Sequence, residues 1–250
     1  ISVVQPNFSC FPIDQKYDLP DEVQDSIFRA LIEQCPSDSR YVLLPETALG
    51  ANSAIWENDW SAAAIIMVAA AIAGEVTVRN ISTLSRQADT AICRALERVG
   101  ASLILESNSI TVKRRELNAF TFDATQCPDL FPALVALAAA CDGVSTIYGV
   151  ERLRGKESDR GETLKEEYGK LGIDIEIDYD ENVMRVVGGV PVAATVDSHD
   201  DHRIAMSAAV LSPIARGETT IKGAECVAKS YPLFFEDFAT LGGRVDNIKL

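Results

Sequence analysis

Apolar and polar positions along the chain form a pattern that occurs three times. Each time, a mostly apolar helix is followed by a glycine, a short β-branched strand, a polar loop and an amphipathic helix that also reaches a glycine. The first glycines of the three units are Gly74, Gly143 and Gly217, and the second are Gly100, Gly172 and Gly242. Glycine just past a helix suits the left-handed position that ends it. The pattern therefore predicts helix ends at all six glycines.

The strands and amphipathic helices recur at corresponding places in the units. The β-branched strands are expected at 76–78, 145–147 and 219–221, and further strands at 103–105, 110–112, 173–177 and 184–187. The amphipathic helices keep apolar residues at helical spacing, as in Ile92, Leu96 and Val99. Corresponding glycines are about 70 residues apart, which is too long for a solenoid repeat. The pattern therefore predicts an α/β fold of three βαβαββ-type units around a shared core. Three unrelated α/β segments are the alternative, which the alignment of the glycines disfavours.

Residues 1–49 have a different character and are expected to form a separate domain from residues 50–250. They contain a predicted strand at 1–4, a turn at Gln5-Pro6-Asn7, an amphipathic helix at 21–34 and a strand at 41–44. The last of the three units is expected to stay incomplete, because the sequence stops at Leu250, soon after its second helix.

Composition and charge exclude several classes of function. The formal net charge is −14, which disfavours nucleic acid and anionic membranes as partners. The longest apolar run, 62–73, is too short to span a bilayer, and no signal peptide is recognisable. The six cysteines are scattered without a metal-binding or disulfide pattern, which predicts free thiols and a cytoplasmic location. Because the net charge is negative, an anionic substrate would need a local cluster of cations.

Four segments place charged groups where a strand or loop gives way to a helix. These are 127–129, 154–160, 200–203 and 228–232. Helix N-termini present unpaired N–H groups, so they attract anions. The cations Lys156, Arg160, Arg203 and Lys229 would complete a site for phosphate or carboxylate.

Two carboxylates, Asp129 and Glu157, would lie among these cations, where mixed charge can tune a pKa for proton transfer. Spacing alone leaves a plainer interpretation open, in which 156–160 is a solvated charged loop. His202 would by default be a helix-start residue with a structural hydrogen bond.

Five motifs give the sequence a resemblance to 5-enolpyruvylshikimate-3-phosphate (EPSP) synthase. Residues 154–160 (RGKESDR) resemble its R-x-K-E-[ST]-D-R signature, residues 201–206 (DHRIAM) its D-H-R-[IM]-A-M helix start, and residues 229–232 (KSYP) its K-[ST]-[FY]-P segment. Cys127-Pro128-Asp129 matches the P-D before a core helix, and residues 59–63 (DWSAA) the entry into the C-terminal domain. Residues 50–250 are accordingly identified as similar to that C-terminal domain, with an enolpyruvyl transferase-like fold. The UDP-N-acetylglucosamine enolpyruvyl transferase of peptidoglycan synthesis shares this fold and is the related alternative.

The resemblance implies an activity and a role for each matching residue. EPSP synthase transfers the enolpyruvyl group of phosphoenolpyruvate to the 5-hydroxyl of shikimate 3-phosphate, without metal or organic cofactor, in aromatic amino-acid biosynthesis. By motif position, Asp129 would orient and help deprotonate the hydroxyl, and Glu157 would exchange protons with the phosphoenolpyruvate carbons. The substrate-binding residues would be Lys156, Arg160, Asp201, His202, Arg203 and Lys229.

The sequence also departs from the family, because the N-terminal half of that two-domain enzyme has no counterpart here. The resemblance thus implies half of a cleft, with its cations facing solvent, that needs an N-terminal domain supplied in trans. The chain alone is expected to be inactive. A noncatalytic folding unit from a truncated or chimeric chain is the alternative.

Residues 1–49 resemble another family, the nitrilase-type domain of apolipoprotein N-acyltransferases. The similarity rests on Gln5-Pro6-Asn7 and on residues 44–49 (LPETAL), where Glu46 would match the general base. That family also needs a Lys and a nucleophilic Cys in segments that this sequence lacks, so no triad can be completed. A strand-helix-strand cap in which Glu46 ends a strand is the alternative.

Overall fold

A computed structural model describes residues 2–4 and 59–246. The helix predicted at 21–34, the strand at 41–44 and Glu46 lie outside the described residues. The strand expected at the start of the sequence is present as β1 (Ser2–Val4). It pairs in parallel with β2 (Glu75–Arg79), so it completes the first sheet of the fold.

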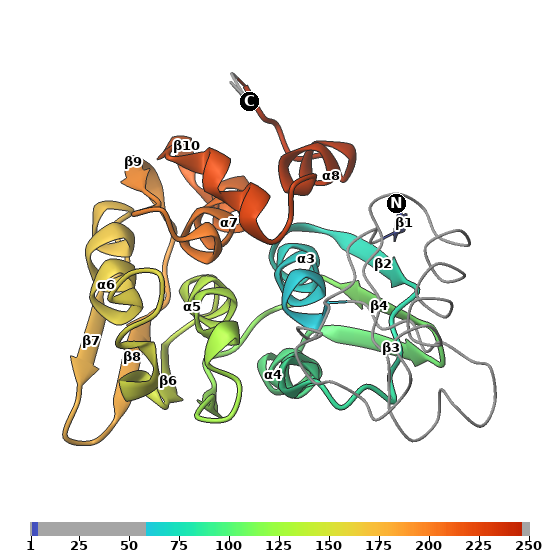
Figure 1. Ribbon diagram of the computed structural model, residues 1–250, viewed down its shortest axis with the longest axis horizontal. Coiled ribbons are helices and arrows are strands. Elements are labelled where there is room, and N and C mark those ends of the chain that lie inside the picture. The colour runs from blue at the N-terminus through green and yellow to red at the C-terminus, as the bar shows by residue number, and fades with distance from the viewer. Residues whose placement is uncertain (1, 5–58, 247–250) are drawn as a thin grey trace, which may run out of the picture.

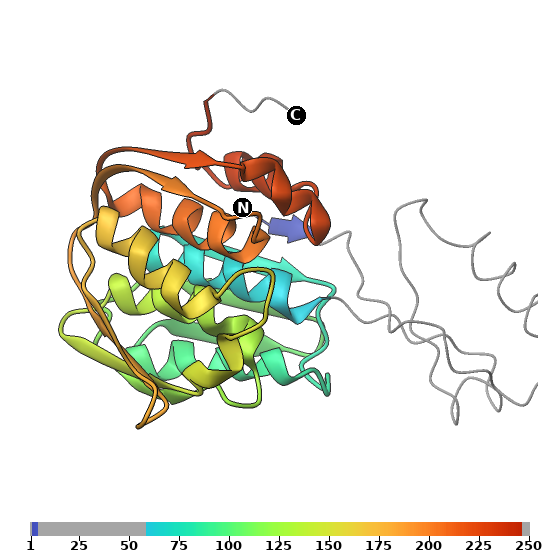
Figure 2. The ribbon, with the colours of Figure 1, turned by 60° about the vertical axis from the view of Figure 1, so that its left-hand side comes forward.

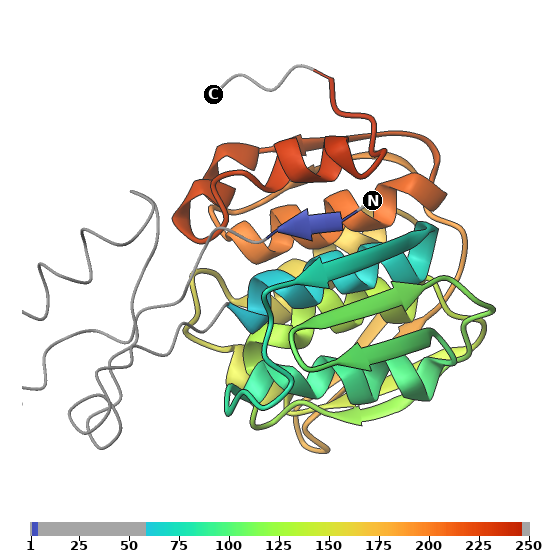
Figure 3. The ribbon, with the colours of Figure 1, turned by 90° about the vertical axis from the view of Figure 1, so that its right-hand side faces the viewer.

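The first unit combines two helices with a four-stranded sheet. Besides β1 and β2 it contains α3 (Trp60–Ala73), a 3-10 turn (Ala88–Ala91), α4 (Ile92–Val99), β3 (Ser102–Glu106) and β4 (Ser109–Lys113). The strand order is β1-β2-β4-β3, with β4 antiparallel to both of its neighbours. Figure 3 shows this sheet face-on, with β1 along its upper edge.

The second unit repeats the same topology. It contains β5 (Thr121–Asp123), a 3-10 turn (Pro128–Leu130), α5 (Phe131–Ala139), β6 (Val144–Tyr148), a second 3-10 turn (Val150–Leu153), α6 (Arg160–Lys170), β7 (Ile175–Asp178) and β8 (Val183–Val187). Its order, β5-β6-β8-β7, matches the first sheet strand for strand, including the parallel first pair. The predicted repeat is confirmed, and sequence analysis missed the short strand β5.

The third unit shows two strands in the part of the chain that the structure describes. It contains β9 (Val192–Asp197), α7 (His202–Leu211), a 3-10 turn (Ser212–Ile214), β10 (Arg216–Lys222), a further 3-10 helix (Ala224–Lys229) and α8 (Phe234–Thr240). Strands β9 and β10 are parallel, like the first pair of the other two sheets. Sequence analysis missed β9.

The core lies between the three sheets, where α3, α5 and α7 pack against one another. Figure 1 shows these helices grouped in the middle, with one sheet on the right, one on the left and β9 and β10 above; Figure 2 shows the same strands lying over α7. All nine residues of α5 are buried, as are all but two of α3, Ser61 and Ala73. The predicted apolar helices are therefore central. Among the described residues, no helix has the length and apolar character needed to cross a membrane.

The two sets of glycines behave differently. Gly100, Gly172 and Gly242 follow the amphipathic helices in the left-handed conformation, as predicted. In the first set, the helix end predicted at Gly74 is confirmed, since Gly74 is the C-cap of α3, but its conformation is not left-handed, and the helix ends predicted at Gly143 and Gly217 are wrong. Gly74 follows α3 with φ −171°, which is extended backbone, because the chain passes directly into β2. Gly143 lies beyond the C-cap residue of α5, and Gly217 lies inside β10.

Candidate active site

The centre of the site is Arg160, the first residue of α6. The preceding Asp159 caps this helix through its side chain, which accepts a hydrogen bond from the Glu162 amide. The Arg160 guanidinium has no solvent-exposed surface. Its Nε lies 2.8 Å from Asp201 Oδ2, one terminal nitrogen lies 3.1 Å from Asp129 Oδ1, and the other lies 2.5 Å from Glu157 Oε2. One guanidinium therefore gathers three carboxylates.

Asp201 is the completely buried partner of this cation and the N-cap of α7. Its side chain accepts a hydrogen bond from the Arg203 amide at 3.0 Å and contacts Ser158 Oγ at 3.4 Å. Because Arg160 starts α6 and Asp201 starts α7, their pairing fixes the ends of two helices from different units against each other. Burial by itself would lower the pKa of Arg160, but Asp201, Glu157 and Asp129 outweigh it and raise that pKa.

Asp129 contacts three cations from two of the predicted segments, 154–160 and 200–203. It lies in the 3-10 turn before α5 and contacts Lys156 Nζ at 3.1 Å, Arg160 at 3.1 Å and Arg203 at 3.4 Å. Burial alone would raise the pKa of Asp129, but Arg203, Lys156 and Arg160 outweigh it and hold that pKa below its usual range. The carboxylate is therefore ionised at neutral pH and accepts hydrogen bonds.

His202 lies beside Glu157 at the start of α7. Its Nδ1 is 4.0 Å from Glu157 Oε1, and within the part of the chain that the structure describes neither ring nitrogen has a hydrogen-bond partner. Its side chain is 7% exposed. Burial and the neighbouring Arg203 lower the pKa of His202, so the imidazole is neutral at neutral pH. The structural hydrogen bond expected for a helix-start histidine is not present, which leaves both nitrogens able to serve a ligand.

Lys229 joins the site through Asp200, the residue before Asp201. Its Nζ is 2.7 Å from the Asp200 carbonyl oxygen and 2.6 Å from Oδ2, and its side chain is 44% exposed. The expected helix start is wrong here. Lys229 is the last residue of a 3-10 helix, and α8 begins only at Phe234, without a side-chain cap. Lys229 thus lies at the end of a 3-10 helix and is held in place by Asp200.

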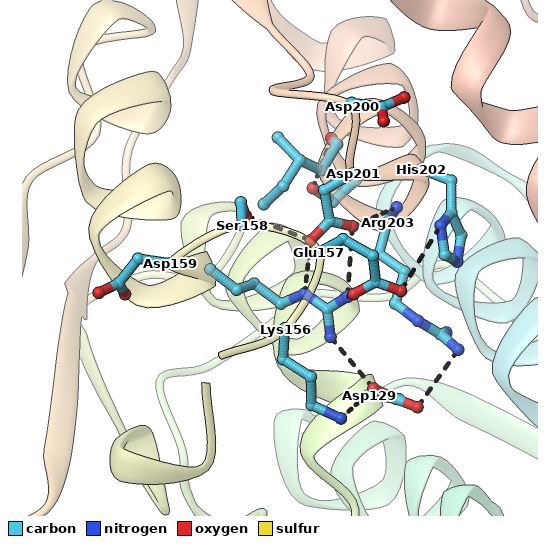
Figure 4. A network of polar contacts seen from close by, with 12 residues as sticks. Asp129, Lys156, Glu157, Ser158, Asp159, Asp200, Asp201, His202 and Arg203 are labelled. Carbon is cyan, nitrogen blue, oxygen red and sulfur yellow. Dashed lines mark hydrogen bonds and ion pairs between the residues drawn. The ribbon is translucent and has the colours of Figure 1, made fainter. Parts of the chain in front are cut away.

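The predicted residues gather in one place. Figure 4 shows Asp129, Lys156, Glu157, Asp201, His202 and Arg203 pointing toward one another, while Asp159 points away. Arg160 and Lys229 belong to the same cluster through the contacts above. The expectation that all four cations face solvent is wrong for Arg160, because three carboxylates neutralise it and allow complete burial. Lys156, Arg203 and Lys229 keep exposed surface.

One acidic residue near the site was missed by sequence analysis. Asp89 lies in the 3-10 turn before α4 and accepts a hydrogen bond from Ser61 Oγ, at the start of α3. Burial raises the pKa of Asp89, and Arg203 and Asp129 are close enough to affect it. No motif marks Asp89, so the only signal was an acidic residue interrupting the start of an apolar helix.

The arrangement suits an anionic ligand and proton transfer beside it. Fixed cations with ionised carboxylates among them stabilise developing charge without reorganisation. The described residues contain one group able to hold a metal ion: Glu166 and Glu167 of α6, with His199 of the turn before α7. There, Lys170 Nζ already contacts Glu167 at 2.7 Å and Glu166 at 3.2 Å. The four described cysteines are free.

The fold is that of enolpyruvyl transferases. It superposes on a structure of EPSP synthase from Acinetobacter baumannii with a TM-score of 0.68 and 27% identity, over 83% of this chain and 48% of that one. It also superposes on the enolpyruvyl transferase NikO from Streptomyces tendae with a TM-score of 0.57 and 18% identity, over 76% and 44% of the two chains.

The family description "EPSP synthase (3-phosphoshikimate 1-carboxyvinyltransferase)" matches residues 26–238, so the chain belongs to the EPSP synthase family. It is 38% identical over 190 residues to the 3-phosphoshikimate 1-carboxyvinyltransferase of Clostridioides difficile, covering 76% of this chain and 44% of that protein. For the Methanocella arvoryzae protein of the same description, identity is 42% over 191 residues, covering 75% and 44%. The chain thus spans less than half the length of these relatives.

Removing the central cation should unfold the site. Arg160→Ala leaves the completely buried Asp201 without its partner, and loss of one member of a buried pair costs about 3–5 kcal/mol. We expect urea unfolding, followed by circular dichroism, to show a loss of that size. Arg185→Ala is the control, because Arg185 pairs with Glu181 at the surface; it should leave the midpoint unchanged. Equal effects of the two variants would contradict a central role for Arg160.

The lowered pKa of Asp129 predicts an acid-dependent stability. A carboxyl whose pKa is lower in the folded than in the unfolded state stabilises the fold above the unfolded pKa, about 4, and loses that contribution as pH falls through the folded pKa. The free energy of unfolding should therefore fall below about pH 4 more steeply in the wild type than in Asp129→Asn. Unfolding by urea at pH 6, 4 and 3 measures both slopes, and parallel slopes would refute the assignment.

Proposed function

We propose that this chain supplies the phosphoenolpyruvate-binding half of a 3-phosphoshikimate 1-carboxyvinyltransferase. One observation carries the proposal: Lys156, Arg203 and Lys229 keep exposed surface around two carboxylates and a neutral histidine. Phosphoenolpyruvate carries a phosphate and a carboxylate, which such cations bind. The second substrate would be shikimate 3-phosphate, and no step needs a metal or organic cofactor.

Each site residue has a proposed role. Asp129, held ionised by its cations, would orient the 5-hydroxyl and receive its proton. Glu157 would deliver a proton to the vinyl carbon of phosphoenolpyruvate and take one back, with His202 beside it. Proton transfer by a positioned carboxyl contributes about 10²–10⁴-fold to a rate.

The cations divide into two groups by exposure. Lys156, Arg203 and Lys229 would contact the anionic groups directly. Arg160 could contact a ligand only if it gave up its contact with one of the three carboxylates. In the free site, Arg160 and Asp201 would therefore position Asp129 and Glu157. The proposal includes a domain boundary near residue 50, with 1–49 as a nitrilase-like segment whose described strand β1 pairs with the first sheet.

Phosphoenolpyruvate should bind this chain weakly. Each contact between an exposed cation and the ligand contributes roughly 0–1 kcal/mol. A few such contacts must offset the translational and rotational freedom that the ligand loses on binding. We expect a Kd of about a millimolar or poorer, weakening with added salt. Titration of the chain with phosphoenolpyruvate at low and at moderate ionic strength, followed by NMR chemical shifts of the backbone amides, tests this expectation. Lys229→Met should weaken binding, whereas Lys113→Met, which removes an exposed cation paired with Glu75, should not. Micromolar affinity that ignores salt would overturn this.

The activity needs groups from both walls of a cleft, because water exclusion and alignment depend on both. We expect phosphate release from phosphoenolpyruvate and shikimate 3-phosphate to be at background with this chain alone. Adding an N-terminal half from a relative should produce turnover, and Glu157→Gln should abolish it. If binding occurs but no added half restores turnover, the chain is a noncatalytic folding unit that keeps the site residues.

A further inference from the structure

Two consecutive residues ahead of α7 adopt a conformation that L-residues avoid. His199 has φ +49° and Asp200 has φ +59°, both in the left-handed region. There the Cβ approaches the following carbonyl oxygen, which costs free energy at each residue. Among the described non-glycine residues, only Asn80 and Asn182 share this feature, and both are isolated positions. Asn, Asp and His all enter this region more readily than other L-residues, but only at 199–200 do two of them follow one another. The 199–200 pair therefore needs an interaction that holds it.

Glu167, two turns into α6, supplies that interaction. Its carboxylate is 1% exposed and reaches the loop with both oxygens. Oε1 lies 2.8 Å from His199 Nε2, and Oε2 accepts a hydrogen bond from the Asp197 amide at 2.8 Å. Burial alone would raise the pKa of Glu167, but hydrogen bonds from Lys170, the Asp197 amide and His199 outweigh it and lower that pKa. The carboxylate thus stays charged and binds the loop at Asp197 and at His199, on either side of Ser198.

The left-handed pair in turn presents two groups to the site. The Asp200 carbonyl and carboxylate hold Lys229, and the next residue, Asp201, pairs with Arg160 and caps α7. A return of residues 199–200 to right-handed backbone would turn the Asp200 carbonyl away from Lys229 and shift the start of α7. The loop conformation and the cation positions are therefore coupled.

We propose that Glu167 and His199 are positioning residues of the anion site. They hold the left-handed 199–200 turn, and through it Lys229 and Asp201, although neither side chain contacts the catalytic carboxylates. The identity of the anion rests on the proposed function. The loop geometry does not, so the two can be tested apart.

Two substitutions of His199 separate the interaction from the backbone conformation. His199→Ala removes the imidazole and keeps the cost of positive φ, whereas His199→Gly removes both, because glycine adopts this conformation freely. In the whole chain, we expect His199→Ala to bind phosphoenolpyruvate about fivefold more weakly than His199→Gly. His199→Gly should approach the wild type. Amide shifts of residues 200–203 in the free proteins should show the same order.

Glu167→Gln tests the other side of the contact. Introduced into the wild type, it should displace the amide signals of 200–203 and weaken phosphoenolpyruvate binding. Introduced into His199→Gly, it should have a smaller effect on both. Glu176→Gln is the control, since Glu176 is an exposed residue of β7 that pairs with Arg185. It should leave loop signals and binding unchanged. Urea unfolding of each variant reports whether a loss of binding follows general destabilisation.

The outcomes are distinguishable. If His199→Ala and His199→Gly have equal affinities and equal loop signals, or if glycine is the weaker binder, the proposal is wrong. If affinity simply follows unfolding free energy across the variants, Glu167 and His199 are structural and the proposal is also wrong. If no variant binds phosphoenolpyruvate or inorganic phosphate, the proposed function fails, while the loop signals still decide the positioning role.

Discussion

The structure depends on the burial of the Arg160 charge among Asp129, Glu157 and Asp201. A lone buried guanidinium would be far too costly, so each carboxylate is required where it lies. These groups come from the turn before α5, the start of α6 and the start of α7. Satisfying one cation therefore fixes the relative positions of three helix starts. The exposed cations of the site are placed on this framework.

The same contacts explain how the proposed anion site can exist in an acidic protein. The formal net charge of −14 would repel a polyanion at long range. At the site, however, Asp129 and Asp201 are already engaged by Lys156, Arg160 and Arg203, so their charges are offset locally. Helix N-termini add partial positive charge at the same end of the core. The attraction is therefore short-ranged and confined to the place where these helices begin.

The sequence predicted the repeat and the site residues because both leave local marks. Apolar spacing and the glycines at 100, 172 and 242 report helix faces and helix ends directly. The short strand β5 has no long β-branched run, so it was missed. Gly217 lies in a strand that pairs with β9 and not at a helix end, so it was misplaced. Motif matching brought Arg160 into the site, but its complete burial depends on Asp201, 41 positions away. Asp89 and Glu167 have partners, Ser61 and His199, that lie 28 and 32 positions away in the sequence, which no local pattern reveals.

The burial of α3 ties the composition of the core to the shape of the site. This helix is rich in alanine, and Ala63, Ala64 and Ala71 have no exposed surface. Small side chains let α3, α5 and α7 approach closely, and at about 1.5 Å per residue Ala71 lies roughly 15 Å along the axis from Ser61 beside Asp89. An added methylene there cannot be absorbed locally in a close-packed interior. It would push the helices apart, and because each helix moves as a unit, their N-terminal ends would be displaced as well. The geometry of the site can thus depend on core volume far from any charged group.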